Sequence, residues 1–491
     1  MRVRESTLIV DQSDNRPDID ARELADQHYN RVLLDGFARD EALPDALVRD
    51  AFSRNLLSIR RADADDRHKQ YRPFSHLLGD GGRILNVLSG PPVPLDKGSN
   101  QRAFNLTWHL NRSGLTTDFL LTAARRRQLP RLTDVLEAIA PRVHTYRNNK
   151  PLLPVRNRLR RESERLYRAA GGELGRAPDL FQERLATRNP EGGRRRLTEL
   201  VSSGRYRAVI LNRAWLTGLM DSARQAAPPS TIWICDTHDV QYVRGADQNR
   251  RERRLWVDQA AEQRAELAQL RKYDYVLAIS TSDAKELRRH LPAERVILAP
   301  SGFDYAYQRL PETPAEPPFV YGFIGNAMGP NVEALRLLAQ EWWPAIRSIA
   351  PGSQLLIAGT ICRDREGKRI AADSDGITML GFVPTLADFY ERIDIALNPV
   401  LVQGGLNFKS VEAAAAARML ITTPLGMKCL GGSSPAVAAA DAAQVAAHVE
   451  RLSRDPAQLH RLRGESQDWY EQHFSEQAAF AELRSLLKST G

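Results

Sequence analysis

The stretch "GGLNFKSVEAAAA", residues Gly404–Ala416, contains two glycines, a lysine, a glutamate three residues later and a run of alanines. The apolar run "DIALNPV" precedes it and "RMLITTP" follows it, so the pattern predicts a strand, a glycine loop, a helix and a second strand. One interpretation is an ordinary helix start with a solvated Lys409–Glu412 pair, worth roughly a few tenths of a kcal/mol. The other is a phosphate site, because the free amides and dipole of a helix N-terminus favour an anion that Lys409 would neutralise.

The same alternation of short apolar runs and amphipathic segments continues on both sides of a linker. The linker is "PETPAEPP", residues 311–318, whose four prolines can continue neither a helix nor a central strand. Before it, "RILNVLSG", a glycine-containing loop, a helix and "TTDFLLTA" predict a βαβ unit, and further strands follow at "YRAVILN", "STIWICDTHD" and "YDYVLAIS". After it, "FVYGFIGN", "SQLLIAG" and "ITMLGFV" predict a second series. We therefore expect an α/β fold of two doubly wound, Rossmann-like domains that face a cleft.

The expected domain limits follow the changes in composition. Residues 1–80 are polar, and "ARELADQHYNRVLLDGFA" and "EALPDALVRDAFSRNLLSI" predict short helices, so this region is expected to be a helical N-terminal extension. The first α/β domain is expected over residues 81–312 and the second over residues 313–465. Residues 466–491 are predicted to be a C-terminal helix that returns to the first domain.

Composition excludes several classes of protein and leaves the partner open. The 491-residue chain has 42% hydrophobic residues and a net charge of +9, with no apolar run of the roughly 20 residues that a membrane helix needs. The N-terminus does not resemble a signal peptide, so we expect a cytoplasmic protein. Cys235, Cys362 and Cys429 are scattered, which argues against a zinc site and against a disulfide framework.

Arginine supplies most of the positive charge and is concentrated in residues 125–200. The partner of this segment could be nucleic acid, an anionic membrane surface or a phosphorylated substrate, and a merely solvated surface is the simpler alternative. Aromatic residues do not interleave with the arginines and no recognition motif is present, so no nucleic-acid partner is expected. A membrane partner would place the protein peripherally on the inner face of the membrane.

Ligands of open α/β sheets lie beyond the carboxyl ends of the strands, which directs attention to the loops there. In the second half these are residues 325–331, 358–364 and 398–409, and in the first half "DTHD" follows the strand "TIWIC". A lone histidine after a strand is more often structural than functional. At a strand end that faces a cleft, however, His238 could hydrogen-bond a sugar or stabilise charge. No second histidine lies at metal-ligand spacing.

Taken in order along the chain, these motifs resemble a known family. "NPVLVQGGLNFKSVEAAAAARMLITTPLGMKCL" resembles the nucleotide-sugar signature of retaining GT-B glycosyltransferases of family 4, the group 1 class. "FIGNAMGPNVEALRLL" resembles the start of that family's donor domain, and "DYVLAIS" with "VILAPSGFD" resembles the end of its acceptor domain. The resemblance covers residues 83 to 480.

The resemblance implies a hexosyl- or glycosyltransferase that moves a sugar from a nucleoside-diphosphate sugar to a hydroxyl acceptor. The acceptor would be a saccharide or a lipid-linked molecule of surface polysaccharide, glycolipid or glycoconjugate synthesis, and neither a metal nor a cofactor would be required. Two alternatives stay open, namely a GT-B-like nucleotide-sugar epimerase or hydrolase, and a non-catalytic basic binding protein.

The resemblance also implies roles for individual residues. Lys409 would contact the donor diphosphate, and His238 would lie near the transferred sugar with Asp239 and Arg244 orienting its loop. The other implied donor-binding residues are Gly98, Gly325, Asn326, Gly404, Gly405 and Glu412. The chain departs from the pattern at Gly404, where many relatives carry a glutamate, and at Asn326, where many carry a basic residue.

Overall fold

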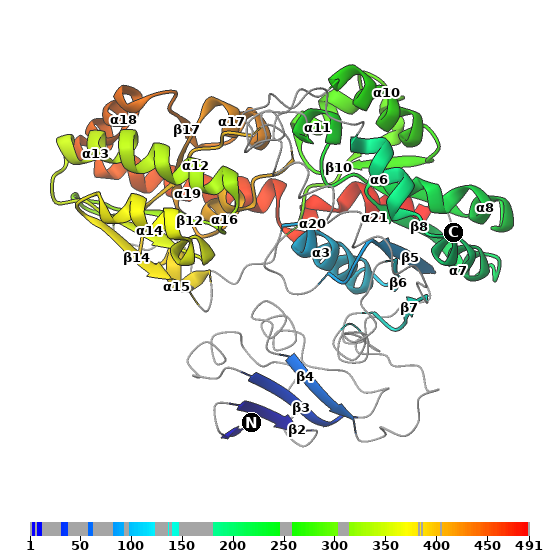
Figure 1. The fold of residues 1–491 in the computed structure, drawn as a ribbon. Coiled ribbons are helices and arrows are strands. Elements are labelled where there is room, and N and C mark those ends of the chain that lie inside the picture. Colours follow the sequence, from blue (N-terminus) through cyan, green and yellow to red (C-terminus); the bar gives the residue numbers. More distant parts are fainter. Residues whose placement is uncertain are drawn as a thin grey trace, which may run out of the picture.

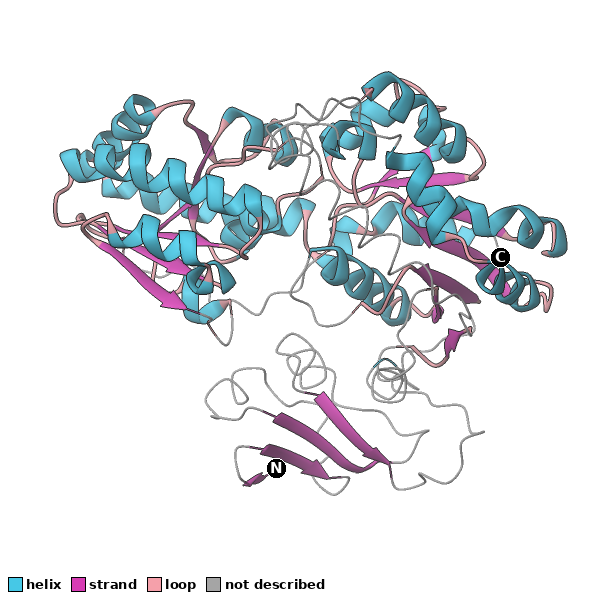
Figure 2. Ribbon diagram, viewed as in Figure 1, coloured by secondary structure: helices cyan, strands magenta, loops and turns pink. Residues whose placement is uncertain are grey.

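The computed structural model describes two parallel α/β domains and a small N-terminal sheet (Figures 1 and 2). Three predicted features lie outside the described residues. They are Gly404, the linker residues 311–313 with the expected domain limit, and most of the arginine-rich segment 125–200. The described residues are 2–4, 7–11, 31–37, 57–61, 82–92, 98–122, 136, 140–146, 180–245, 258–302, 314–381, 383, 386–402 and 405–489.

The first domain is built on a seven-stranded sheet of order β11-β10-β9-β8-β5-β6-β7, in which every pairing is parallel. Its strands are almost continuously apolar because both faces are covered. Neighbouring residues of β5 separate accordingly, Ile84 into the core on one face and Leu85 into the core on the other. The strands are β5 (Arg83–Leu88), β6 (Thr116–Leu121), β7 (Val143–Thr145), β8 (Tyr206–Asn212), β9 (Ile232–Asp236), β10 (Tyr275–Ala278) and β11 (Val296–Leu298).

Helices cover this sheet where the amphipathic segments were predicted. The charged segment after β9 forms a helix whose first described turn is capped by Asp258, which accepts a hydrogen bond from the Ala261 amide at 3.0 Å. The described helices are α3 (Gly98–Arg112), α6 (Leu180–Arg188), α7 (Glu191–Val201), η2 (Ala214–Leu219), α8 (Met220–Ala226), α10 (Gln259–Leu270), α11 (Thr281–Leu287) and η3 (Ala293–Arg295).

The second domain has a six-stranded parallel sheet of order β14-β13-β12-β15-β16-β17. The strands are β12 (Val320–Ile324), β13 (Gln354–Ala358), β14 (Ile377–Gly381), β15 (Ile395–Asn398), β16 (Met419–Thr422) and β17 (Val437–Ala438). The short strand β17 lies inside the run "SPAVAAADAAQV", although alanine has the highest helix propensity. The helix begins only at Ala442, because Asp441 caps it by accepting from the Gln444 amide.

The helices of the second domain include one long segment interrupted by a π-helical turn. The segment "NVEALRLLAQEWWPAI" is divided among α12 (Gly329–Leu337), η4 (Leu338–Trp342) and α13 (Trp343–Ile349). Trp342 and Trp343 are buried, so they belong to the core as their spacing suggests. The other helices are η5 (Thr360–Arg363), α14 (Arg365–Ala372), α15 (Ala387–Tyr390), α16 (Phe408–Ala415), α17 (Pro424–Leu430) and α18 (Ala442–Arg454).

Each sheet contains a point at which the strand order reverses, and these points locate the ligand sites. In the first domain the chain builds outward from β5 to β7 and then from β8 to β11 on the other side. In the second domain it builds from β12 to β14 and then from β15 to β17. Open α/β sheets bind ligands beyond the strand ends at such a reversal. The loops after β5, β8, β12 and β15 are therefore the places to look.

The C-terminal helices run from the second domain to the first (red in Figure 1). They are α19 (Pro456–His473), α20 (Glu476–Ala479) and α21 (Ala481–Ser489). Helix α19 packs on α16, whereas α20 contacts α3 and α21 contacts β11. Phe480 and Leu483 complete the first domain's core together with Leu106. Residues 466–491 thus end against the first domain, as several helices rather than one.

The expectation of a helical extension at residues 1–80 is wrong for its described part, which is a four-stranded sheet of order β1-β2-β3-β4. Strands β1 and β2 are antiparallel, and β3 pairs in parallel with β2 and β4. The apolar run at Val32–Leu34 is too short to distinguish a helical period from a strand period, and pairing on both sides decides for the strand. The strands are β1 (Arg2–Arg4), β2 (Thr7–Asp11), β3 (Arg31–Phe37) and β4 (Leu57–Arg61). No helix among the described residues is long and apolar enough to cross a membrane.

Candidate functional site

Lys409 lies in the first turn of α16, next to the loop that follows β12. Its Nζ atom donates to Asn331 Oδ1 at 2.8 Å and lies 4.6 Å from the ring centroid of Phe323. The side chain is half-buried, and burial lowers the pKa of Lys409 to about 8, an effect that Glu412 partly opposes. The ammonium is thus held by a neutral amide and an aromatic face, with a carboxylate one helical turn away.

The loop after β12 presents Gly325 and Asn326 to this lysine. The Gly325 amide donates to Ala358 O at 3.0 Å, which ties the loop to β13. A Cβ atom at Gly325 would come within 3.4 Å of Lys409 Nζ, so the glycine and the lysine are neighbours. Asn331 joins the loop by donating to Asn326 Oδ1 at 2.6 Å. These contacts bring together Lys409, Gly325 and Asn326, which lie far apart in the sequence.

Glu412 is buried beneath the same helix. The Tyr390 hydroxyl lies 3.1 Å from Lys409 O and 3.3 Å from Glu412 Oε2, so its single proton is shared between these two acceptors. Burial, together with Glu412, raises the pKa of Tyr390 well above its usual value, so the phenol stays neutral and acts as a donor. Lys409 and Glu412 are therefore not the solvated surface pair of the simpler interpretation, because α16 packs its first turn into the domain.

Gly405 approaches the first domain at the start of this loop. It has φ 72°, a left-handed conformation that glycine adopts readily. A Cβ atom there would lie 2.5 Å from Asp239 Oδ1 and 3.5 Å from an Arg244 nitrogen, so only a glycine fits. The Gly405 backbone also lies close enough to Asp283 of α11 to lower the pKa of that carboxyl. Gly405 thus joins the second domain's loop to three charged residues of the first.

Asp239 is ionised and held between two arginines. It pairs with Arg244 and with Arg213 Nη1 at 3.2 Å, and the side-chain nitrogen Nε2 of Gln241 donates to it at 3.1 Å. Burial raises the pKa of Asp239, but Arg244 and Arg213 outweigh it and hold the pKa below its usual value. Burial, together with the nearby charge of Asp239, raises the pKa of Asp283 to about 7. The sequence predicted Asp239 and Arg244 here but missed Arg213 and Asp283.

Gly98 begins α3 and faces the beginning of α16. A Cβ atom at Gly98 would lie 3.1 Å from Phe408 Cε2. The N-termini of a first-domain helix and a second-domain helix therefore meet, and the first-turn amides of a helix are groups of the kind that bind anions. Helix α3 follows β5 and α16 follows β15, so both belong to the strand-order reversals.

His238 follows β9 in a left-handed backbone conformation with φ 59°. Such conformations are uncommon outside glycine and occur often at functional sites. The preceding strand, β8, also ends at a left-handed residue, Arg213, with φ 84°. Two adjacent strands thus turn sharply at the same edge of the sheet, and the turns aim Arg213 and His238 at the same region.

A chain of buried hydrogen bonds fixes the tautomer of His238. Thr107 donates to a backbone carbonyl at 2.9 Å, so it must accept from Asn86 Nδ2 at 3.1 Å. Asn86 Oδ1 then accepts from Asn212 Nδ2, which leaves Asn212 Oδ1 to accept from His238 Nε2 at 2.8 Å. The proton of His238 is on Nε2, and Nδ1 is a buried acceptor without a partner among the described residues.

His238 is neutral at physiological pH. Burial, with the nearby charges of Arg213 and Arg102, lowers the pKa of His238 to about 4, although Asp236 opposes this shift. Asp236 itself forms a fully buried ion pair with Arg102 of α3 at 3.0 Å. His238 therefore has the chemistry of a hydrogen-bond acceptor rather than of a cation. The sequence analysis missed Arg102 and the two asparagines. A polar residue inside an apolar strand is the signal that could have found Asn86, which interrupts the strand "RILNVL".

No metal centre is found in the described part of the chain, where no three histidine, cysteine, aspartate or glutamate side chains cluster. The three cysteines are buried and form no disulfide. Gly404, the remaining predicted site residue, lies outside the described residues, next to Gly405.

Comparisons with known proteins identify the fold. Sucrose-phosphate synthase from Thermosynechococcus elongatus is 17% identical, with a TM-score of 0.53 over 83% of this chain and 98% of that one. Anabaena HepE, solved with UDP-glucose, is 13% identical, with a TM-score of 0.53 over 83% and 99%. A glycosyltransferase from Rickettsia africae is 12% identical, with a TM-score of 0.55 over 84% and 99%. The fold is GT-B.

Residues 318–455 match the family model described as Glycosyl transferases group 1. The GT-B match therefore extends over both domains, whereas the sequence match is confined to the second, which contains Lys409 and Glu412. A search of curated protein sequences gives no match.

Proposed function

We propose that the protein is a retaining glycosyltransferase that moves a sugar from a nucleoside-diphosphate sugar to an acceptor hydroxyl. One observation carries the proposal. Lys409 lies at the N-terminus of α16 beside the loop after β12, at the strand-order reversal of the domain that matches group 1 glycosyltransferases. The Anabaena HepE structure, which shares the fold, contains UDP-glucose.

In this proposal the second domain holds the nucleotide. The α16 amides and Lys409 would bind the diphosphate, and the loop at Gly325 and Asn326 would lie against it. Glu412 would accept hydrogen bonds from the ribose hydroxyls, with Tyr390 orienting its carboxylate. The bond from the anomeric carbon to the acceptor oxygen would form as the bond to the diphosphate breaks, and the proton of the acceptor hydroxyl would pass to an oxygen of the departing diphosphate. Lys409 and the amides stabilise the charge that the leaving diphosphate gains.

The first domain would supply the acceptor side. His238 Nδ1 would accept a hydrogen bond from a hydroxyl of the transferred sugar, a role supported by the hydrogen bond to Asn212 that keeps the proton on Nε2. Asp239 would hold the histidine loop in place through its two arginines. A lipid-linked acceptor would suit membrane docking by the arginine-rich residues 125–200, and liposome co-sedimentation at low salt tests that part separately.

The decisive experiment is a thermal-shift screen of nucleotide sugars, followed by analysis of the product formed with candidate acceptors. Lys409→Ala is expected to abolish the donor-induced shift, whereas Lys368→Ala, at an exposed lysine in the same domain, is expected to keep it. A new glycosidic bond with the donor's anomeric configuration supports the proposal. A free sugar or an epimerised donor would assign a hydrolase or an epimerase instead.

A further inference from the structure

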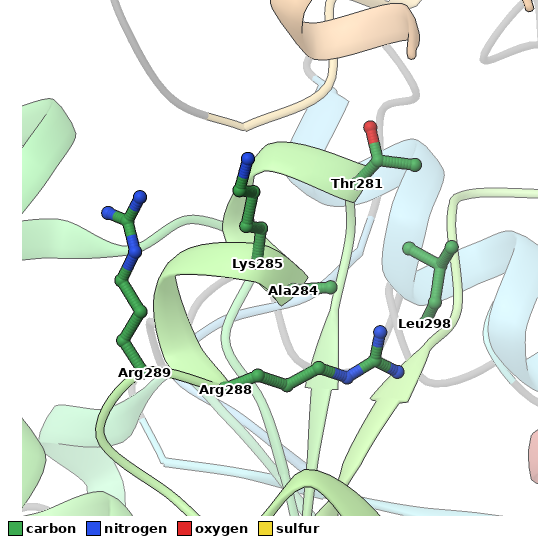
Figure 3. A pocket seen from close by; sticks show the side chains of 6 residues that line it. All are labelled: Thr281, Ala284, Lys285, Arg288, Arg289 and Leu298. Carbon is green, nitrogen blue, oxygen red and sulfur yellow. The ribbon is translucent and has the colours of Figure 1, made fainter. Parts of the chain in front are cut away.

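A basic pocket lies beside the candidate site, on the outer side of α11 (Figure 3). Thr281, Ala284, Lys285 and Arg288 follow the spacing i, i+3, i+4, i+7, so they share one face of the helix. Figure 3 shows Arg288 extending from this face toward Leu298, at the end of β11. The cavity has a volume of about 350 Å³, and Arg289 also lines it.

The lining of the pocket is positively charged, with no acidic residue in it. Arg289 is partly neutralised by Glu286, whose carboxylate accepts from it at 2.5 Å. Arg288 donates one hydrogen bond, to the backbone oxygen of Val296 at 2.8 Å, which fixes its direction. Neither Lys285 nor Arg288 forms an ion pair within the described part of the chain.

Three cations on neighbouring turns of one short helix repel one another, and like charges at this spacing destabilise a helix. An anion bound between them would relieve the repulsion. Arg288 presents further guanidinium N–H groups, Lys285 presents an ammonium group, and Thr281 presents a hydroxyl. This combination suits a phosphate or a carboxylate, whose oxygens accept several charge-assisted hydrogen bonds.

The position of the pocket links it to the chemistry proposed above. Two of its lining residues, Thr281 and Leu298, lie at the carboxyl ends of β10 and β11, the edge on which α/β sheets bind ligands, whereas Arg288 is bonded to Val296 at the start of β11. Thr281 faces the second domain, since its Oγ1 atom lies 3.4 Å from where a Cβ atom of Gly431 would be. Asp283 of the same helix lies beside Gly405 in the loop before α16, whose backbone lowers the pKa of that carboxyl. Helix α11 therefore contacts the loop of the donor site and also forms the wall of the basic pocket.

We propose that this pocket is a subsite for an anionic group of the acceptor, a phosphate or a carboxylate, bound by Lys285, Arg288 and Thr281. The assignment to an acceptor rests on the proposed function, whereas the anion site itself does not. The cationic face selects a charged acceptor over a neutral sugar and holds it at the boundary between the two domains.

The test is a titration of inorganic phosphate into the full-length protein at low ionic strength, with the heat of binding measured by calorimetry. The Lys285→Gln/Arg288→Gln variant is expected to raise the dissociation constant at least tenfold. Arg295→Gln removes one charge from an exposed residue outside the pocket and is expected to change the constant less than about twofold. Equal affinities of the double variant and the Arg295→Gln control would overturn the proposal, as would an absence of saturable binding by the wild type.

Lys409→Ala distinguishes this pocket from the donor site, because phosphate binding at Lys285 and Arg288 is expected to survive that substitution. Loss of binding in Lys409→Ala alone would place the anion at α16 and refute the pocket. Vesicles of phosphatidylcholine with and without phosphatidylglycerol identify the source of the anion. Binding to the anionic vesicles that the double variant loses indicates a lipid headgroup, and binding of free phosphate alone indicates a soluble acceptor.

Nucleotide-sugar binding is measured in parallel. The double variant is expected to bind the donor as the wild type does, which also shows that it folds. If the wild type binds phosphate in the pocket but binds no nucleotide sugar, the proposed function fails and the acceptor assignment fails with it, whereas the anion site stands.

Discussion

The lowered pKa of Lys409 gives donor binding a specific pH dependence. Burial lowers the pKa of this lysine to about 8, so the free protein loses the charge as the pH rises through that value. A bound diphosphate favours the protonated form and binds it selectively. Donor affinity is therefore expected to be nearly constant below about pH 7 and to weaken about tenfold between pH 7 and pH 9, as linkage requires for one proton.

The same linkage predicts proton uptake on binding. At pH 8 half of the Lys409 side chains are neutral, so binding is expected to take up about 0.5 proton per donor molecule. Calorimetry in two buffers of different ionisation enthalpy measures this uptake directly. Asp283, whose pKa burial raises to about 7, also titrates near the site, and Asp283→Asn removes its contribution.

The matched control is the nucleoside without phosphates, whose affinity is expected not to vary between pH 7 and pH 9. An unchanged donor affinity over that range, with no proton uptake at pH 8, would show that Lys409 does not bind the diphosphate. The same conclusion would follow if the nucleoside and the donor weakened in parallel.

The remaining predictions concern Gly405 and His238. Gly405→Ala is expected to weaken donor binding and lower the melting temperature, because a left-handed alanine costs roughly 1–2 kcal/mol and its Cβ atom would lie 2.5 Å from Asp239 Oδ1. Gly432→Ala, where nothing lies within 4 Å, is the control, and equal effects of the two substitutions would contradict the reasoning. His238→Ala is expected to lower kcat/KM by roughly tenfold, the effect of one lost hydrogen bond, and nitrogen NMR is expected to find the ring proton on Nε2. A proton on Nδ1, or a histidine pKa near 6.5, would refute the assigned network.

Much of the fold was predictable because the signals are local. The buried parallel strands appear as short apolar runs, and the loops that follow them carry glycine, so the pattern of β12, α12 and β13 can be predicted from the chain alone. The helix prediction for the N-terminal region was wrong because it, too, rested on a local signal. Its apolar run at Val32–Leu34 is only as long as one strand or one helical turn, and the decision was made by pairing with β2 and β4.

The site residues likewise separate into those with a local sequence signal and those that depend on tertiary contacts. Lys409 and His238 were predictable because each follows a strand end, and the rule that ligands bind there needs no tertiary information. Arg213, Asp283 and Asn331 were not, because their importance comes from contacts with residues 26 to 122 positions away. An asparagine in the first turn of α12 resembles any helix start until Lys409 is placed against it.

The charges at the domain boundary bear on the role of Asn326. This residue is uncharged, whereas the family pattern described above has a basic residue in the same loop. Near Gly405 the first domain presents two arginines, Arg213 and Arg244, against one fully ionised carboxylate, Asp239. Asp283 is only partly ionised at neutral pH, because burial and Asp239 both disfavour a second negative charge. The boundary is therefore net positive where Gly405 leads into α16. A diphosphate at this helix would experience Lys409, the helix amides and the first domain's arginines together. The charge missing from the loop after β12 would in this way be supplied across the domain boundary, and donor affinity would then depend on how closely the two domains approach.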